Sequence, residues 1–137
     1  MSPYDRAQGI DPNIIKSLEK LPKVMKNNQN KEVSIRAEAR NETGKEHIAV
    51  VVHGLQVRDI SLIKKALKTP DFVCEDPNNH WKKNYYIKRR GKHGPNNRNK
   101  GILLKVVTYV KPDGTEEIVT VFPTNSIKTL KRNWNQL

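Results

Sequence analysis

The chain has 137 residues, of which 35% are hydrophobic and 6% aromatic, so we expect one domain with a small core of Ile, Val and Leu. Its 26 Lys and Arg residues outnumber 14 Asp and Glu residues, and this net charge of +12 favours a polyanionic partner. The single Cys74 excludes an internal disulfide and a Cys-rich zinc site. The longest apolar stretch, Ile48 to Val52, is far too short to span a membrane, so no membrane partner is expected.

The positive charge is concentrated in the second half of the chain. Residues 1–76 carry 13 basic and 11 acidic side chains, whereas residues 77–137 carry 13 basic and 3 acidic ones. No carboxylate lies between Asp76 and Asp113, which is typical of a nucleic-acid-binding surface. We therefore expect RNA contacts at Lys82, Lys83, Tyr85, Lys88, Arg89, Lys92, Arg98 and Lys128.

The first part of the chain predicts a helix, then a pair of strands, then a second helix. Asp11 and Pro12 form a helix start, and the apolar spacing continues to Leu21 before Pro22. Residues 1–30 are thus an N-terminal helical segment, joined to a basic α+β domain over residues 31–137 within a single domain overall. Alternation over residues 33–39 and a β-branched run over 47–53 favour a hairpin, although the Ala, Glu and Arg content of the first segment would also suit a helix. A second helix is predicted over residues 59–69, capped by Asp59 or Ser61.

The second part of the chain predicts a series of strands, over residues 72–75, 85–90, 102–110 and 117–122. Lys111-Pro112-Asp113-Gly114 is suited to a tight turn between the last two. The predicted fold class is therefore α+β, with N-terminal helices packed on one face of a four- to five-stranded antiparallel sheet.

Alternation also predicts which side chains share a face. In residues 102–110 we expect one set to pack on the helices: Ile102, Leu104, Val106, Thr108 and Val110. Lys105 then lies on the opposite face. Thr120 joins it there if Val119 and Val121 are in the core. This places a cation and a hydroxyl on one surface of the sheet.

Two histidines are candidates for proton transfer. If residues 47–53 are extended, His47 and His53 lie on one face, and the unperturbed pKa of imidazole lies near neutral pH. Alternatively, one is a surface residue and the other is hydrogen-bonded at a strand end. We expect His80 and His93 in polar loops, as solvent-exposed residues or phosphate contacts.

These residue types suit RNA cleavage by attack of the 2′-hydroxyl. That reaction needs a base, an acid and cations around the phosphorus. We assign the proton transfers to His53 or His47, stabilisation of the phosphorane to Arg90 and Lys105, and orientation of the phosphate to Thr120. No metal or cofactor is expected, because the clustered carboxylates of a two-metal site are missing from the basic block.

The stretch 46–128 resembles the toxin superfamily that groups barnase, EndoU, the colicin-type tRNases and RelE, especially its phage and polymorphic-toxin branches. The resembling segments are Glu46-His47-Ile48, His53-Gly54-Leu55, residues 68–73, Tyr85-Tyr86, residues 104–107 and residues 118–123. Many relatives place a helix around the first histidine, which differs from the hairpin predicted above.

The resemblance implies a metal-independent ribonuclease, often acting on tRNA, that a cognate immunity or antitoxin protein neutralises. We expect its site of action to be the cytoplasm. An acidic inhibitor would fit so basic a chain. The resemblance carries the catalytic histidine onto His47 or His53, the basic residue onto Arg90 or Lys105, and the hydroxyl onto Thr120. Such a domain is either made where it acts or delivered as part of a larger toxin.

Two other function classes stay open at this point. A non-enzymatic RNA- or ribosome-binding module would use Trp81, Tyr85, Tyr86 and Trp134 for base stacking. A DNA-binding regulator is disfavoured, because no second helix precedes the helix at 59–69 with helix-turn-helix spacing.

Overall fold

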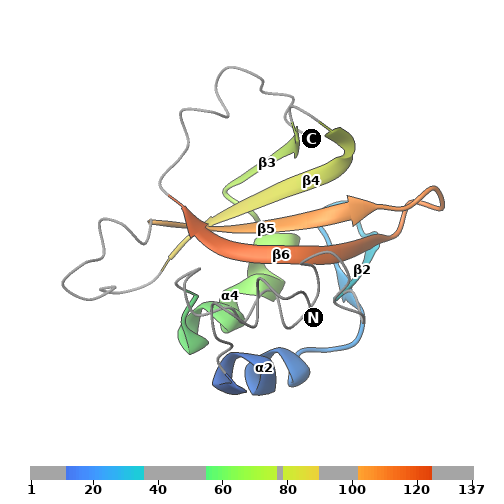
Figure 1. The fold of residues 1–137 in the computed structure, drawn as a ribbon. Helices are drawn as coiled ribbons and strands as arrows, with labels where there is room; N and C mark the ends of the chain where they lie inside the picture. The colour runs from blue at the N-terminus through green and yellow to red at the C-terminus, as the bar shows by residue number, and fades with distance from the viewer. Residues whose placement is uncertain (1–11, 36–54, 77–78, 90–101, 125–137) are drawn as a thin grey trace, which may run out of the picture.

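The computed structural model describes residues 12–35, 55–76, 79–89 and 102–124, and its fold is α+β (Figure 1). The elements in chain order are α2 (Pro12–Glu19), β1 (Met25–Lys26), β2 (Glu32–Ile35), α4 (Val57–Lys68), β3 (Phe72–Asp76), β4 (Asn79–Lys88), β5 (Leu103–Val110) and β6 (Glu116–Thr124). Within these ranges, no helix has both the length and the apolar character to cross a membrane.

The strands form one six-stranded mixed sheet in the order β1-β2-β6-β5-β4-β3. All neighbouring strands are antiparallel except β2 and β6, which run parallel with Val33 opposite Glu116 and Ile35 opposite Ile118. The predicted four- to five-stranded antiparallel sheet is therefore wrong in strand number and in direction. Alternation in residues 33–39 indicated a strand but could not identify its partner, which lies more than eighty positions further along the chain. The predicted partner, residues 47–53, lies outside the described residues.

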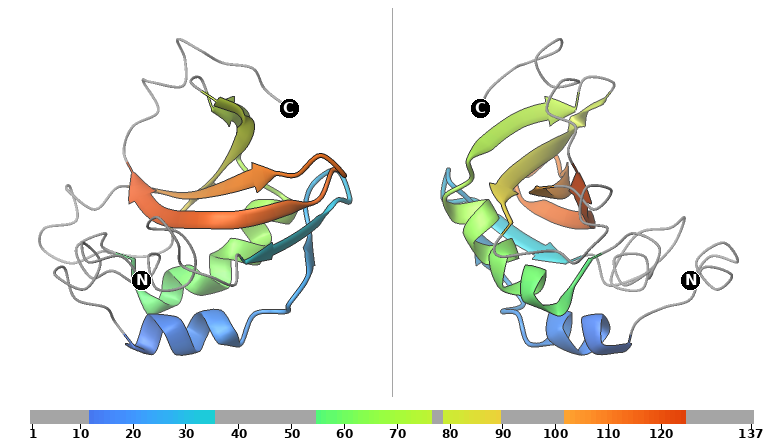
Figure 2. Two further views of the ribbon diagram at one scale, coloured as in Figure 1. Left: turned by 45° about the vertical axis from the view of Figure 1, so that its right-hand side comes forward. Right: turned by 90° about the vertical axis from the view of Figure 1, so that its left-hand side faces the viewer.

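The helices cover one face of the sheet, as predicted. Helix α4 packs against β4, β5 and β1, and α2 packs against α4 (Figures 1 and 2). Helix α2 contributes Ile14 and Leu18 to the core, and α4 contributes six buried residues. The apolar stripes of both helices, at spacings of three and four residues, therefore face inward.

Helix α4 begins two residues before the predicted start. Asp59 lies at its third position, and its carboxylate accepts a hydrogen bond from the backbone N–H of Gln56 at 2.8 Å. Asp59 therefore caps the helix from inside the first turn, as the acidic member of a capping box does. The helix ends where predicted, with the N–H of Thr69 donating to the carbonyl of Lys65 directly before Pro70.

The hairpin between β5 and β6 closes through the predicted turn. Gly114 has a φ of 90°, a left-handed conformation that glycine adopts without strain, and its N–H donates to the carbonyl of Lys111. The Oδ1 atom of Asp113 accepts hydrogen bonds from the N–H and the hydroxyl of Thr115. Strand β5 begins at Leu103, so Ile102 is 56% exposed and does not join the helix-facing set as predicted.

Candidate functional site

The sheet has a second face that points away from the helices. Eight side chains on this face form two neighbouring rows that cross four strands. The register of β3, β4, β5 and β6 aligns the first row as Phe72, Tyr86, Lys105 and Phe122, and the second as Cys74, Asn84, Val107 and Thr120. We call these eight residues the distal face. Between these two rows lies a third, whose side chains point to the opposite face and belong to the helix-facing core: Val73, Tyr85, Val106 and Val121.

A β-bulge in β6 lets Ile118 and Thr120 lie on opposite faces of the sheet. Val107 pairs with Thr120, but its neighbour Thr108 pairs with Ile118, so Val119 is the extra residue of β6. Ile118 therefore stays in the helix-facing core while Thr120 joins Lys105 on the opposite side. Lys105 and Thr120 therefore share a face, as the alternation predicted. The prediction also placed both Val119 and Val121 in the core, but Val119 lies in the bulge and only Val121 belongs to the core cluster.

Lys105 lies at the centre of the distal face, between two aromatic rings. Its Nζ is 5.7 Å from the ring centroid of Tyr86 and 5.3 Å from that of Phe122. Burial lowers the pKa of Lys105 from its usual value, and the negative charge of Asp76 partly opposes this effect. A partly desolvated ammonium attracts an anion more strongly than a hydrated surface lysine does.

The other ionisable groups of this face remain neutral near neutral pH. Burial is the largest cause that raises the pKa of the Tyr86 phenol, with further contributions from Cys74 and Asp76. Burial likewise raises the pKa of the Cys74 thiol, against the lowering effect of Lys105. Neither group is therefore suited to act as an anionic nucleophile or base here.

Two polar atoms on the distal face have no hydrogen-bond partner. They are the Oδ1 atom of Asn84 and the Oγ1 atom of Thr120, both inaccessible to solvent. Asn84 and Thr120 flank Val107 on the same row, and Lys105 is diagonal to both, because it is two residues before Val107 on β5. The face thus combines a cation with two buried oxygen atoms that lack a hydrogen-bond partner.

Of the expected RNA contacts, Lys82 and Lys88 lie on β4 at the two ends of the distal face. Lys82 is half-buried and Lys88 is exposed. The alternation of β4 gives both side chains the same orientation as Asn84 and Tyr86.

Arg89 was expected to contact RNA, but it is buried in an ion pair with Asp59. Its guanidinium binds the Asp59 carboxylate through two hydrogen bonds, from Nε to Oδ1 at 3.0 Å and from Nη2 to Oδ2 at 2.8 Å. Both side chains are at most 1% exposed. The ion pair joins the end of β4 to the first turn of α4, and a phosphate cannot reach Arg89 while that pair is intact.

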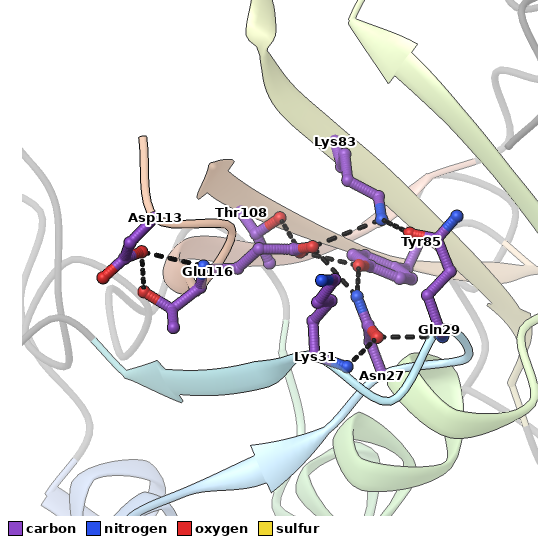
Figure 3. Close-up of polar contacts among 9 residues, drawn as sticks. Asn27, Gln29, Lys31, Lys83, Tyr85, Thr108, Asp113 and Glu116 are labelled. Atoms are coloured by element: carbon purple, nitrogen blue, oxygen red, sulfur yellow. Dashed lines mark hydrogen bonds and ion pairs between the residues drawn. The ribbon is translucent and has the colours of Figure 1, made fainter. Parts of the chain in front are cut away.

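Lys83 and Tyr85 are also buried on the helix side, around the carboxylate of Glu116 (Figure 3). The Oε1 atom of Glu116 accepts from the hydroxyls of Tyr85 at 2.6 Å and Thr108 at 2.7 Å. Its Oε2 atom accepts from Asn27 at 2.9 Å and from the ammonium of Lys83 at 3.2 Å. Four donors saturate the carboxylate, so this cluster, which we call the Glu116 network, is structural rather than a vacant site.

The Glu116 network attaches the N-terminal hairpin to the sheet. The Oδ1 atom of Asn27 accepts from the N–H groups of Gln29 and Lys31, which shapes the turn between β1 and β2. The Nδ2 group of the same side chain donates to Glu116 and to the hydroxyl of Tyr85. One asparagine therefore connects the turn to the centre of the sheet.

The network predicts a loss of stability at alkaline pH. Burial is the largest cause that raises the pKa of Tyr85 above its usual value of about 10, and the charge of Glu116 adds to it. Above about pH 10 the unfolded chain loses this proton while the folded chain keeps it, so the free energy of unfolding falls as pH rises. Urea unfolding followed from pH 8 to 11 should show this fall, and Tyr85→Phe should reduce its slope. Equal slopes in wild type and Tyr85→Phe would contradict the assignment.

Several predicted site residues lie outside the described residues: His47, His53, Arg90, Lys92, Arg98 and Lys128. Among the stacking residues of the binding-module alternative, Tyr85 and Tyr86 are buried and Trp81 is 54% exposed. The fourth, Trp134, lies outside the described residues. Over the ranges that the structure describes, no three His, Cys, Asp or Glu side chains form a group that could hold a metal ion.

Comparison with known proteins assigns the chain to no family. No protein-family model matches it, and no curated protein or solved structure matches it significantly.

Proposed function

We propose that this chain is a metal-independent endoribonuclease that binds RNA, with tRNA favoured, across the distal face of its sheet. The observation that carries the proposal is the position of Lys105, a half-buried cation between two aromatic rings and diagonal to the hydroxyl of Thr120. The net charge of +12 supports a polyanionic substrate.

In this proposal Lys105 and Thr120 handle the reacting phosphate. Diagonal neighbours in an antiparallel sheet have side chains roughly 7–8 Å apart, so a phosphate lying between them is within reach of both. The ammonium of Lys105 stabilises the charge that develops on the phosphorane, and the Thr120 hydroxyl donates to a phosphate oxygen. Charge stabilisation of this kind is strongest where water is partly excluded, as it is around Lys105.

Proton transfer is assigned to His53 or His47, with Arg90 as a second cation, and these roles rest on the sequence alone. One of the two imidazoles removes the proton of the 2′-hydroxyl, and the other imidazole protonates the leaving 5′-oxygen. Lys82 and Lys88, at the two ends of the distal face, guide the RNA backbone across it. An acidic immunity or antitoxin protein that covers this face would inhibit the enzyme.

The direct test is incubation of the purified chain with total cellular RNA in the presence of EDTA. Wild type should produce discrete fragments, and His53→Ala, His47→Ala and Thr120→Val should show which residues the reaction needs. A hydroxyl-to-methyl change at Thr120 preserves side-chain volume, so lost cleavage with unchanged unfolding would assign a role to the hydroxyl itself. Intact RNA at every protein concentration, with salt-sensitive binding retained, would replace the enzyme with a non-enzymatic RNA-binding module.

A further inference from the structure

Asn84 is an unusual residue for the centre of a sheet. It lies on β4 between β3 and β5, its side chain is on the distal face, and it is only 1% exposed. Asparagine is rare in central strands, because its polar side chain packs poorly against the apolar neighbours of a buried sheet. Its presence there requires a specific hydrogen bond or a function.

Within the folded chain the oxygen of Asn84 has no such hydrogen bond. The other buried polar side chains among the described residues each make at least one hydrogen bond: Asn27, Asp59, Lys83, Arg89, Thr108 and Glu116. The Oδ1 atom of Asn84 is one of two exceptions, and the other is Oγ1 of Thr120. A buried acceptor without a donor has lost its hydrogen bonds to water and gained none in the protein, so such atoms are uncommon and call for an explanation such as a functional role.

The two exceptions occur together, beside the cation on which the proposed function depends. Asn84 and Thr120 lie on one row of the distal face with only Val107 between them, and Lys105 is diagonal to both. Two unrelated packing defects would have no reason to fall on the same row. A bound ligand that supplies the missing hydrogen bonds explains both at once.

We propose that Asn84 is a specificity-determining residue, whose Oδ1 atom accepts a hydrogen bond from the nucleotide that Lys105 and Thr120 hold. This inference rests on the proposed RNA substrate. An amide oxygen requires an N–H or O–H donor, which an RNA nucleotide offers as an amino or ring N–H group of its base or as its 2′-hydroxyl. Both oxygen atoms are shielded from water, so the ligand reaches them only when a neighbouring side chain moves.

The role of Asn84 predicts opposite effects on stability and on binding. Asn84→Leu removes the unsatisfied oxygen at similar volume, so its melting temperature should equal or exceed that of wild type. The same variant should bind RNA about tenfold more weakly, because the hydrogen bond to the nucleotide is lost. A residue with only a structural role would not lower affinity while leaving the fold intact.

The experiment measures binding of labelled oligonucleotides in EDTA by fluorescence anisotropy, on wild type and Asn84→Leu. The probes are the homo-oligomer that wild type binds most tightly among those of the four nucleotides, the same oligomer with the N–H donors of its base removed or methylated, and the same oligomer with 2′-hydrogen in place of 2′-hydroxyl. Wild type should lose affinity for one of the two modified probes, which identifies the donor. Asn84→Leu should bind that probe and the unmodified one equally.

Two results would overturn the inference. One is equal affinity of wild type for all three probes, a measurement that stands even if Asn84→Leu does not fold. The other is a folded Asn84→Leu that discriminates between the probes as wild type does. RNA that is bound but never cleaved would remove the proposed ribonuclease activity without bearing on Asn84, so the two proposals fail separately.

Discussion

Replacing Lys105 with Met should lower kcat/KM for RNA cleavage by about 10² to 10³, the usual cost of removing one group that stabilises transition-state charge. Methionine keeps an unbranched apolar stem of similar length between the rings of Tyr86 and Phe122, so packing is preserved. Because the ammonium is partly desolvated in the folded chain, its removal should not destabilise the fold. Single-turnover cleavage together with thermal unfolding measures the two effects separately.

The matched control for Lys105 is Lys88→Met. Lys88 has the same side chain and orientation on the neighbouring strand, but it is exposed at the end of the distal face. Its loss should weaken RNA binding modestly, and the effect should shrink further as salt is raised. If the two variants lose the same amount of activity, Lys105 is one phosphate contact among many and has no special role in the reaction.

Replacing Arg89 with Met should lower the free energy of unfolding by about 3–5 kcal/mol, because it leaves the carboxylate of Asp59 buried without its partner. The loss is large against the total stability of a small domain, about 5–15 kcal/mol. Urea unfolding at neutral pH measures it. RNA affinity of the remaining folded protein should be unchanged, since the guanidinium faces α4 rather than the distal face.

The control for Arg89 is the double variant Arg89→Met with Asp59→Asn. Asparagine removes the buried charge but keeps an oxygen that can accept from the N–H of Gln56, so the helix cap survives. The double variant should recover a large part of the stability that Arg89→Met loses. A single variant that unfolds like wild type but binds RNA poorly would instead return Arg89 to the RNA contacts.

The elements that sequence predicted well are those specified by neighbouring residues. Helix α4, the turn at Asp113-Gly114 and the shared face of Lys105 and Thr120 follow from apolar spacing, turn residues and strand alternation. The parallel pairing of β2 with β6 could not be predicted, because no local pattern indicates which distant strand a short strand joins.

The roles of individual charges were the least predictable part of the site. Arg89 belongs to a run of cations that indicates an exposed surface, yet its partner Asp59 lies thirty positions earlier on another element. Glu116 and Glu117 are adjacent and chemically alike, but strand alternation buries only the first among donors. Asn84 gave no signal at all, since an unpaired buried oxygen can be recognised only when its surroundings are known.

The most direct test of the proposed function is the chemistry of the RNA ends after digestion in EDTA. Attack by the 2′-hydroxyl leaves a 2′,3′-cyclic phosphate on one fragment and a 5′-hydroxyl on the other, and both can be identified by end-labelling and mass spectrometry. We predict these ends for wild type and their loss for Lys105→Met. Fragments with 5′-phosphate ends, or RNA that stays intact under all conditions, would contradict the account.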